Sequence, residues 1–301
     1  MTDFIAKPFG VLMEFIYNNL AFHNYGYAII VFTLIVKIIL LPLNVKQQRS
    51  MERQQALMPE LEALRNKYKD DNNKYQEEQM NLYNKYKINP MSGCLPMLIQ
   101  FPLIIILYRI IRRPLTYISG LSAAVVKALA EAFTGTGAGE AFVKNWANHE
   151  IDINNFFMSN QSSFTEIAGS SAKLINMKFL GFFDLGVTPQ WKFWTYGADW
   201  KIYVPLLLIP ILAVATSYLS QAVTTYINNG GKKKKKEEKK EKSTADMMNN
   251  MVKFMPLMTL VIGFMVPAGL GLYWTVSNVL TMLQTVLIKL LFNRKKKEGS
   301  V

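Results

Sequence analysis

Long uncharged stretches, separated by blocks of basic residues, constrain this chain more than any other feature. Of its 34 Lys and Arg residues, nine lie within 46–87, nine within 232–253 and four within 294–297. The stretches between these blocks run for about 17 to 22 residues, the length that a helix rising about 1.5 Å per residue needs to cross about 30 Å of hydrocarbon. The pattern predicts a helical membrane protein rather than a basic soluble one, despite the net charge of +13.

We expect an all-α polytopic membrane protein with five transmembrane helices. The predicted regions are an interfacial N-terminal helix (1–26), span one (27–45), a cytoplasmic helical hairpin (46–88), span two (89–113), an extracellular loop (114–201), span three (202–222), a basic cytoplasmic loop (223–253), spans four and five (254–292) and a basic cytoplasmic tail (293–301). Pro267, Gly269 and Gly271 supply the turn between the last two spans.

The positions of Lys and Arg set the expected orientation. With five spans and the N-terminus outside, the three basic blocks lie in the cytoplasm, and the outer loop carries six basic and seven acidic residues. A sixth span at 114–133 would move the lysines of 232–242 outside, so we interpret 114–133 as amphipathic and interfacial or extracellular. Arg109, Arg112 and Arg113 are local exceptions, which we interpret as snorkelling to lipid headgroups.

Residues 46–88 are polar but carry two stripes at helical spacing. The first stripe is Leu57, Leu61, Leu64 and Tyr68, and the second is Tyr75, Gln79, Leu82 and Tyr86. Matched stripes on either side of a turn-like run at 70–73 predict an antiparallel helical hairpin. Its nine basic and seven acidic residues make a mixed exterior, which favours a solvated hairpin that orders the two spans over a nucleic-acid site.

Lys37 lies ten residues into the first span, in the run FTLIVKIILLPL. A cation at that depth costs about 2.5 to 3.5 kcal/mol on insertion scales. No acidic residue occurs in any of the five predicted spans to pair with it. We therefore predict a water-filled pocket that keeps the ammonium hydrated. The alternative is that Lys37 snorkels to the inner face from a short, tilted helix.

Polar residues in other spans favour the pocket, although each alone is usually a helix-packing residue. They are Gln100 in span two, Thr216, Ser217, Ser220 and Gln221 in span three, and Thr275, Ser277, Asn278 and Gln284 in span five.

The spans lack the groups on which most enzymes depend. His23 and His149 both lie outside them, and the chain has no HExxH, P-loop or GxSxG motif. The single cysteine, Cys94, excludes an internal disulfide and a thiolate metal cluster. We expect neither an enzyme nor a cofactor or metal. A small-solute transporter or channel is the alternative, although the spans have no convincing internal repeat and no carboxylate.

Four segments combine Pro, Gly and aromatic residues in a more specific arrangement than hydropathy alone. They are YGYAIIVFTLIVKIILLPLNVKQQ at 25–48, NPMSGCLPMLIQFPLIIILYRII at 89–111, FLGFFDLG at 179–186 and MPLMTLVIGFMVPAGLGLYWTVSN at 255–278. In this order they resemble the YidC/Oxa/Alb family of membrane protein insertases. The short N-terminus is similar to the smaller bacterial form of that family.

The resemblance implies five spans with the N-terminus outside, in the bacterial cytoplasmic membrane. It implies that the protein inserts other membrane proteins and helps them fold, alone or beside the Sec translocon. The family's helices form a hydrophilic groove that is open to the cytoplasm and the bilayer and closed outside. The partners would be newly made membrane proteins and lipids, with no small-molecule substrate.

The resemblance also assigns groove residues by position. Lys37 stands where the family has a first-span arginine, Tyr273 and Trp274 match a groove-facing aromatic pair, and Gln221 matches a polar third-span position. The full predicted substrate groove is Lys37, Gln100, Gln221, Tyr273, Trp274, Asn278 and Gln284.

Two basic runs are expected to contact anionic lipid or the ribosome. They are Lys232, Lys233, Lys234, Lys235 and Lys236 in the loop, and Arg294, Lys295, Lys296 and Lys297 in the tail. The ribosome contact is what the family's co-translational role implies.

Overall fold

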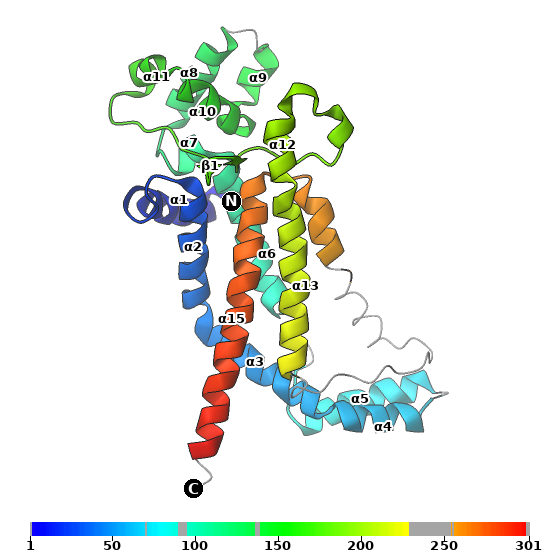
Figure 1. Ribbon diagram of the computed structural model, residues 1–301. Helices are drawn as coiled ribbons and strands as arrows, with labels where there is room; N and C mark the ends of the chain where they lie inside the picture. Colours follow the sequence, from blue (N-terminus) through cyan, green and yellow to red (C-terminus); the bar gives the residue numbers. More distant parts are fainter. Residues whose placement is uncertain are drawn as a thin grey trace. The chain divides into compact units, whose positions relative to one another are not determined.

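The computed structural model describes residues 2–69, 71–89, 95–135, 139–228, 254 and 256–298, and they are mostly helical (Figure 1). The helices are α1 (Thr2–Asn19), α2 (Tyr25–Ile39), α3 (Leu41–Ala56), α4 (Met58–Lys67), α5 (Asn72–Lys85), α6 (Leu95–Arg112), α7 (Pro114–Tyr117), α8 (Ala123–Thr134), α9 (Glu140–Lys144), α10 (Glu150–Met158), α11 (Gln161–Ala168), α12 (Trp200–Leu206), α13 (Leu208–Asn228) and α15 (Ala268–Glu298). The chain divides into two compact units.

Among the described residues, two helical stretches are long and apolar enough to cross a membrane. One is Trp200–Ile227, which joins α12 and α13, and the other is Ala268–Leu291 within α15. A third candidate is the pair α2 and α3, which is bent by 61°. Where spans two and four were predicted, α6 and residues 256–263 are helical. These findings agree with a helical membrane protein.

The first predicted span is not one straight helix. α2 ends at Ile39, and α3 starts at Leu41 and continues to Ala56. Pro42 accounts for the break, because proline has no N–H and its ring clashes with the carbonyl one turn earlier, that of Ile38. The helix boundaries therefore differ from the predicted ones, and part of the segment assigned to the hairpin belongs to α3.

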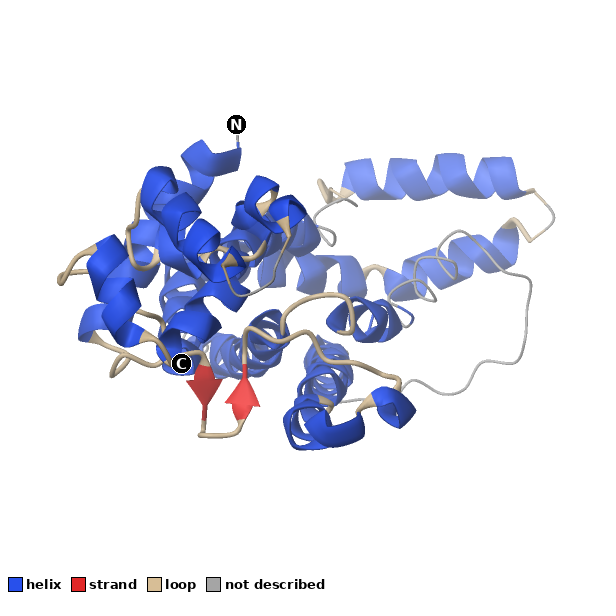
Figure 2. Cartoon of the chain, turned by 90° about the horizontal axis from the view of Figure 1, so that it is seen from above, coloured by secondary structure: helices blue, strands red, loops and turns tan. Residues whose placement is uncertain are grey.

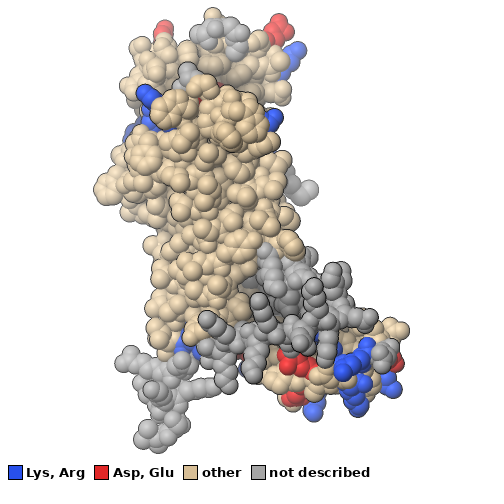
Figure 3. Space-filling model, turned by 45° about the vertical axis from the view of Figure 1, so that its right-hand side comes forward, with Lys and Arg blue, Asp and Glu red and all other residues tan. Residues whose placement is uncertain are grey.

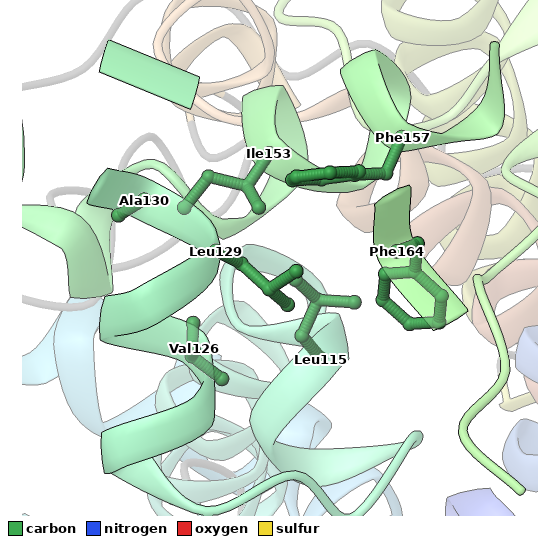
Figure 4. Packing of buried hydrophobic residues seen from close by; sticks show 7 residues of the cluster. All are labelled: Leu115, Val126, Leu129, Ala130, Ile153, Phe157 and Phe164. Atoms are coloured by element: carbon green, nitrogen blue, oxygen red, sulfur yellow. The ribbon is translucent and has the colours of Figure 1, made fainter. Parts of the chain in front are cut away.

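The first unit contains the described residues of Met1–Val36, Leu103–Tyr218 and Lys242–Asn278. Within it, the described residues of 114–168 form a helical domain with a core of its own, here called the α7–α11 domain (Figure 4). Its core residues are Leu115, Val126, Leu129, Ala130, Ile153, Phe157 and Phe164. The segment considered as a sixth span is split here, because α7 ends at Tyr117 and α8 begins at Ala123, with Gly120 at φ 68° between them.

Arg112 and Arg113 connect the end of α6 to this domain. Arg113 Nε donates to Glu150 Oε1 at 3.0 Å, and Arg112 Nη2 donates to the carbonyl of Asn148 at 3.0 Å. Arg113 also lies over the rings of Tyr117 and Trp146, 5.6 and 5.4 Å from their centroids. The snorkelling interpretation was therefore wrong for these two arginines, since protein groups bind them.

The Glu150 carboxylate is the buried centre of this connection. Its side chain is 0% exposed, and it accepts hydrogen bonds from the Thr116 N–H at 2.8 Å and the Thr116 hydroxyl at 2.5 Å as well as from Arg113. Burial raises the pKa of Glu150, and the bonds from Thr116 and Arg113 offset part of that shift.

A small hairpin is the exception to the helical fold among the described residues. β1 (Lys178–Phe179) pairs antiparallel with β2 (Phe183–Asp184), drawn as red arrows in Figure 2. The chain that follows caps α15: the carbonyls of Val187 and Leu185 accept from Ala268 N and Gly269 N at 2.9 and 2.8 Å. Those N–H groups have no partner inside the helix, so the segment after the hairpin satisfies the start of α15.

α1 is apolar on two faces. Met13, Ile16 and Tyr17 are buried, whereas Val11 and Phe15 are exposed. A single buried face is enough for a helix on the surface of a soluble protein. The second, exposed apolar face matches the predicted position of this helix at a membrane interface, which stays a prediction.

The second unit contains the described residues of Lys37–Pro102, Leu219–Glu241 and Val279–Val301. In it, α4 and α5 pack as a hairpin around Leu57, Leu61 and Ile88, with Leu82 and Tyr83 against them. Asp71 caps α5 by accepting from Lys74 N at 3.0 Å, and Tyr86 donates to Glu60 at 2.8 Å. Lys, Arg, Asp and Glu intermix on this hairpin, at the lower right of Figure 3.

Candidate functional site at the break between α2 and α3

Lys37 occupies the last turn of α2, where the helix breaks. The last four carbonyls of any α-helix have no partner within it, and in α2 these include the carbonyl of Lys37. In a bilayer each unsatisfied backbone group costs several kcal/mol. Two groups of Lys37 therefore need partners: its carbonyl needs a hydrogen-bond donor because of the break, and its ammonium needs an acceptor because it is charged.

α15 supplies both the acceptor and the donor, from residues of the same unit as Lys37. Lys37 Nζ donates to the Thr281 hydroxyl at 2.8 Å. Gln284 Nε2 donates to the Lys37 carbonyl at 3.0 Å, and Gln284 Oε1 accepts from Asn44 Nδ2 at 3.2 Å. Gln284 thus contacts α2 and α3 on the two sides of the break.

The acceptor for the Lys37 ammonium is a neutral group. Among the residues that the structure describes, no Asp or Glu forms an ion pair with Lys37. Glu52, the one acidic residue of α3, is already paired with Lys289 of α15 at 3.0 Å. Lys37 is half-buried, and no carboxylate in the described part of the chain pairs with it to cancel its electrostatic field.

A second polar cluster lies in the first unit. Asn278 Nδ2 donates to the Ala213 carbonyl at 3.2 Å, to the Thr216 hydroxyl at 3.3 Å and to the Ser217 hydroxyl at 2.8 Å. These bonds join α15 to α13. Asn278 is therefore a helix-packing residue in this structure, as polar residues between membrane helices often are.

The remaining predicted groove residues differ in exposure. Tyr273 is buried, with 1% of its surface exposed, and Trp274 is half-buried in the same unit. Gln100 and Gln221 are half-buried and belong to the unit that contains Lys37. The structure brings Lys37 and Gln284 into direct contact; the predicted grouping of the others stays a prediction.

The basic runs are only partly described. Lys232–Lys236 lie outside the described residues, as does Cys94. For the tail, the structure describes a helical backbone through Arg294–Lys297, because α15 extends to Glu298. The contact of these runs with lipid or the ribosome stays a prediction.

Sequence reasoning missed Thr281 and Asn44. Thr281 lies three residues before Gln284, the spacing that puts two residues on one face of a helix. Asn44 follows Pro42 and so lies just beyond the helix break that this proline causes. These two spacings were the available signals, and either would have pointed to the partners of Lys37 and Gln284.

This site offers electrostatics and hydrogen bonding rather than covalent chemistry. It contains one ammonium, two amides and a hydroxyl, and no base beside a nucleophile. Elsewhere in the described part of the chain, no cluster of three or more His, Cys, Asp and Glu side chains is arranged to hold a metal ion.

Comparison with known proteins decides the family. The family model described as "60Kd inner membrane protein" matches residues 15–296, nearly the whole chain. The chain belongs to this family.

Curated relatives carry the name "Membrane protein insertase YidC". The chain is 28% identical to that of Campylobacter jejuni over 300 residues, which is 99% of this chain and 40% of the relative. It is 26% identical to that of Helicobacter pylori over 297 residues, again 99% of this chain and 38% of the relative. The relative from Clostridium tetani is 42% identical over 132 residues, or 43% of this chain and 60% of that protein. The chain therefore spans about two fifths of the length of the first two relatives.

Proposed function

We propose that the protein is a membrane protein insertase and folding chaperone of the bacterial cytoplasmic membrane. The observation that carries the proposal is a half-buried lysine with a neutral partner at a helix break, in a chain whose family match extends over residues 15–296. The names of the curated relatives support the same activity.

The proposed topology has five spans, with the N-terminus outside and the C-terminus in the cytoplasm. In it, α1 lies in the outer interface with its exposed apolar face toward lipid, and the α7–α11 domain is extracellular. The α4–α5 hairpin and the basic segments are cytoplasmic, in agreement with the positive-inside distribution.

The proposed mechanism is electrostatic and hydrophobic. A hydrated groove that contains Lys37 attracts a polar or acidic segment of a client and lowers the desolvation cost of its crossing. The apolar helix of the client then partitions into lipid, which supplies the driving free energy. Lys37 attracts the client and undergoes no chemical change.

The proposed partners follow from this mechanism. Newly made membrane proteins are the clients, and lipids receive their helices. The Sec translocon and the ribosome are further proposed partners, with the basic runs at 232–236 and 294–297 as the contact for ribosomal RNA or anionic headgroups.

Substitution of Lys37 tests the function. We expect Lys37→Ala and Lys37→Glu to reduce insertion of a client with an acidic translocated segment by about tenfold, the effect of roughly 1.4 kcal/mol, and Lys37→Arg to preserve it. Insertion is measured in cells depleted of the native insertase and rescued by each variant. Equal activity of the glutamate variant contradicts the electrostatic role.

Water accessibility separates the insertase from a transporter or channel. Single cysteines at positions 37, 221 and 274, on a Cys94→Ser background, are exposed to membrane-impermeant reagents from each side. Labelling from the cytoplasm alone is the expected result for a groove closed outside. Labelling from both sides supports a continuous pore, and no labelling contradicts a hydrated groove.

A further inference from the structure

The break between α2 and α3 is an unstable place for a functional lysine unless another element fixes it. Helix ends fray, and the bend of 61° leaves the last carbonyls of α2 without regular donors. A lysine side chain on such an end samples many positions, since it has four rotatable bonds. The direction of its ammonium therefore depends on what holds the backbone at the break.

We propose that Gln284 is the positioning residue for Lys37, acting as a two-sided bridge that fixes the bend between α2 and α3. Its amide N–H donates to the Lys37 carbonyl, and its amide oxygen accepts from Asn44 in the first turn of α3. One side chain thus joins the last turn of one helix to the first turn of the next. The inference rests on the proposed function, because it assigns Gln284 a role in the electrostatic action of Lys37.

Two further contacts of α15 hold Lys37 and α3 in place. Thr281, one turn before Gln284, accepts from the Lys37 ammonium at 2.8 Å. Lys289, further along α15, forms the 3.0 Å ion pair with Glu52 of α3. α15 thereby holds the ammonium of Lys37, the backbone of Lys37 and the body of α3 at successive positions.

The amide is suited to this role in a way that its chemical relatives are not. A glutamine supplies one donor and one acceptor at the end of the same side chain, as the bridge requires. Glutamate lacks the donor and adds a carboxylate beside the cation. Leucine lacks both groups and leaves the Lys37 carbonyl and the Asn44 amide unsatisfied, at a cost that is large in apolar surroundings.

The test uses the full chain in proteoliposomes and two versions of one client, identical except that the acidic residues of the translocated segment are neutral amides in the second. The readout is the ratio of acidic to neutral client inserted. Gln284→Leu and Gln284→Glu are each expected to lower this ratio about fivefold, toward the value of Lys37→Ala, since a misdirected or neutralised cation no longer favours the acidic client. A merely structural defect lowers both clients equally and leaves the ratio unchanged.

The matched control is Thr285→Val. The Thr285 hydroxyl is buried on the same helix, and it donates at 2.9 Å to the Thr281 carbonyl of its own helix. Its removal is expected to leave the ratio as in the unmodified chain. Gln284→Glu has the size of the native residue, so it gives a result even where leucine lowers the amount of folded protein.

The outcomes separate the two proposals. If Lys37→Ala itself leaves the ratio unchanged, the electrostatic function fails, and the positioning role fails with it. If Lys37→Ala lowers the ratio while both Gln284 variants match Thr285→Val, the function stands and the positioning role of Gln284 is overturned.

Discussion

Two cations of this chain, Arg113 and Lys37, lie in different units and have opposite surroundings. Arg113 pairs with the fully buried carboxylate of Glu150 and lies over two aromatic rings. Lys37 donates to the hydroxyl of Thr281 and, among the described residues, has no carboxylate partner. Lys37 lies within one predicted span and Arg113 at the end of another, so the hydropathy of the spans does not distinguish the surroundings of the two cations.

The difference teaches how to tell a structural cation from one that acts on a ligand. A paired charge is neutralised locally, and its field falls off quickly, so the Arg113–Glu150 pair fixes one helical domain against the end of α6. An ammonium with a neutral acceptor keeps its field and can attract an incoming anion. An ammonium in a membrane span without an anionic partner costs folding free energy, as expected of a residue that serves function rather than stability.

Removal of the Glu150 carboxylate is expected to have the largest effect, which is a loss of stability of the α7–α11 domain. Glu150→Ala leaves Arg113 without its buried partner and the Thr116 N–H without its acceptor, at a cost of about 3 to 5 kcal/mol in the stability of the α7–α11 domain. Limited proteolysis of residues 114–177 in the purified protein measures this loss.

The control for that change is Glu131→Ala. Glu131 pairs with Lys127 at 3.6 Å, and both side chains are more than half exposed. Its loss is expected to cost less than about 0.5 kcal/mol. Similar protease resistance of the two variants would contradict a structural role for the Arg113–Glu150 pair.

A carboxylate placed beside Lys37 tests whether the contrast between Lys37 and Arg113 depends on the charge of the partner. Thr281→Asp replaces the neutral acceptor with an anion of similar size and so gives Lys37 the kind of partner that Arg113 has. We expect the preference for an acidic client over its neutral version to fall about tenfold, corresponding to roughly 1.4 kcal/mol.

Thr281→Asn is the matched variant, since it offers a neutral acceptor of the same size as aspartate. It is expected to retain most of the preference in the same proteoliposome assay. A loss in Thr281→Asn as large as that in Thr281→Asp means that shape rather than charge at position 281 matters.

The smallest expected effect is a pH dependence in the stability of the α7–α11 domain, and it is specific to Glu150. Burial raises the pKa of Glu150 above its ordinary value of 4.5, so the folded state holds the proton more tightly than the unfolded state does. The resulting stability is fully present below about pH 4.5 and is lost as pH rises through the raised pKa of the folded state.

Glu150→Gln, which cannot titrate, isolates this contribution. Thermal unfolding of the purified protein is followed from about pH 4, near the ordinary pKa of a carboxyl group, to about pH 8. Burial also raises the pKa of Asp184, which changes stability in the same direction in both proteins. A pH profile of Glu150→Gln that parallels the unmodified chain would contradict a titrating Glu150.

The helical class was predictable because it depends on local chain properties. Uncharged runs of span length and the helical spacing of the two stripes that contain Leu57, Leu61 and Leu82 are visible without knowledge of the fold, and the described residues of these segments are mostly helical. The break at Pro42 was also within reach, since proline disrupts a helix through its own ring.

The partners of individual side chains were not predictable in the same way. The sequence suggested headgroups for Arg113, whereas the structure gives a carboxylate 37 residues away, and it named no protein partner for Lys37, which donates to a hydroxyl 244 residues away. The exposed or buried state of Tyr273 and Trp274 was equally out of reach, because it depends on which helices lie against α15.

By itself, then, the sequence determined that this chain forms apolar helices separated by basic segments, because hydrophobicity, charge and proline act on their own neighbourhood. It also carried the Pro and Gly pattern by which the family is recognised. Only the tertiary structure decided that Gln284 bridges the helix break, that Arg113 pairs with a carboxylate and that Lys37 donates to a hydroxyl. Those outcomes depend on distances between side chains far apart in the chain, and such distances exist only after the helices have packed.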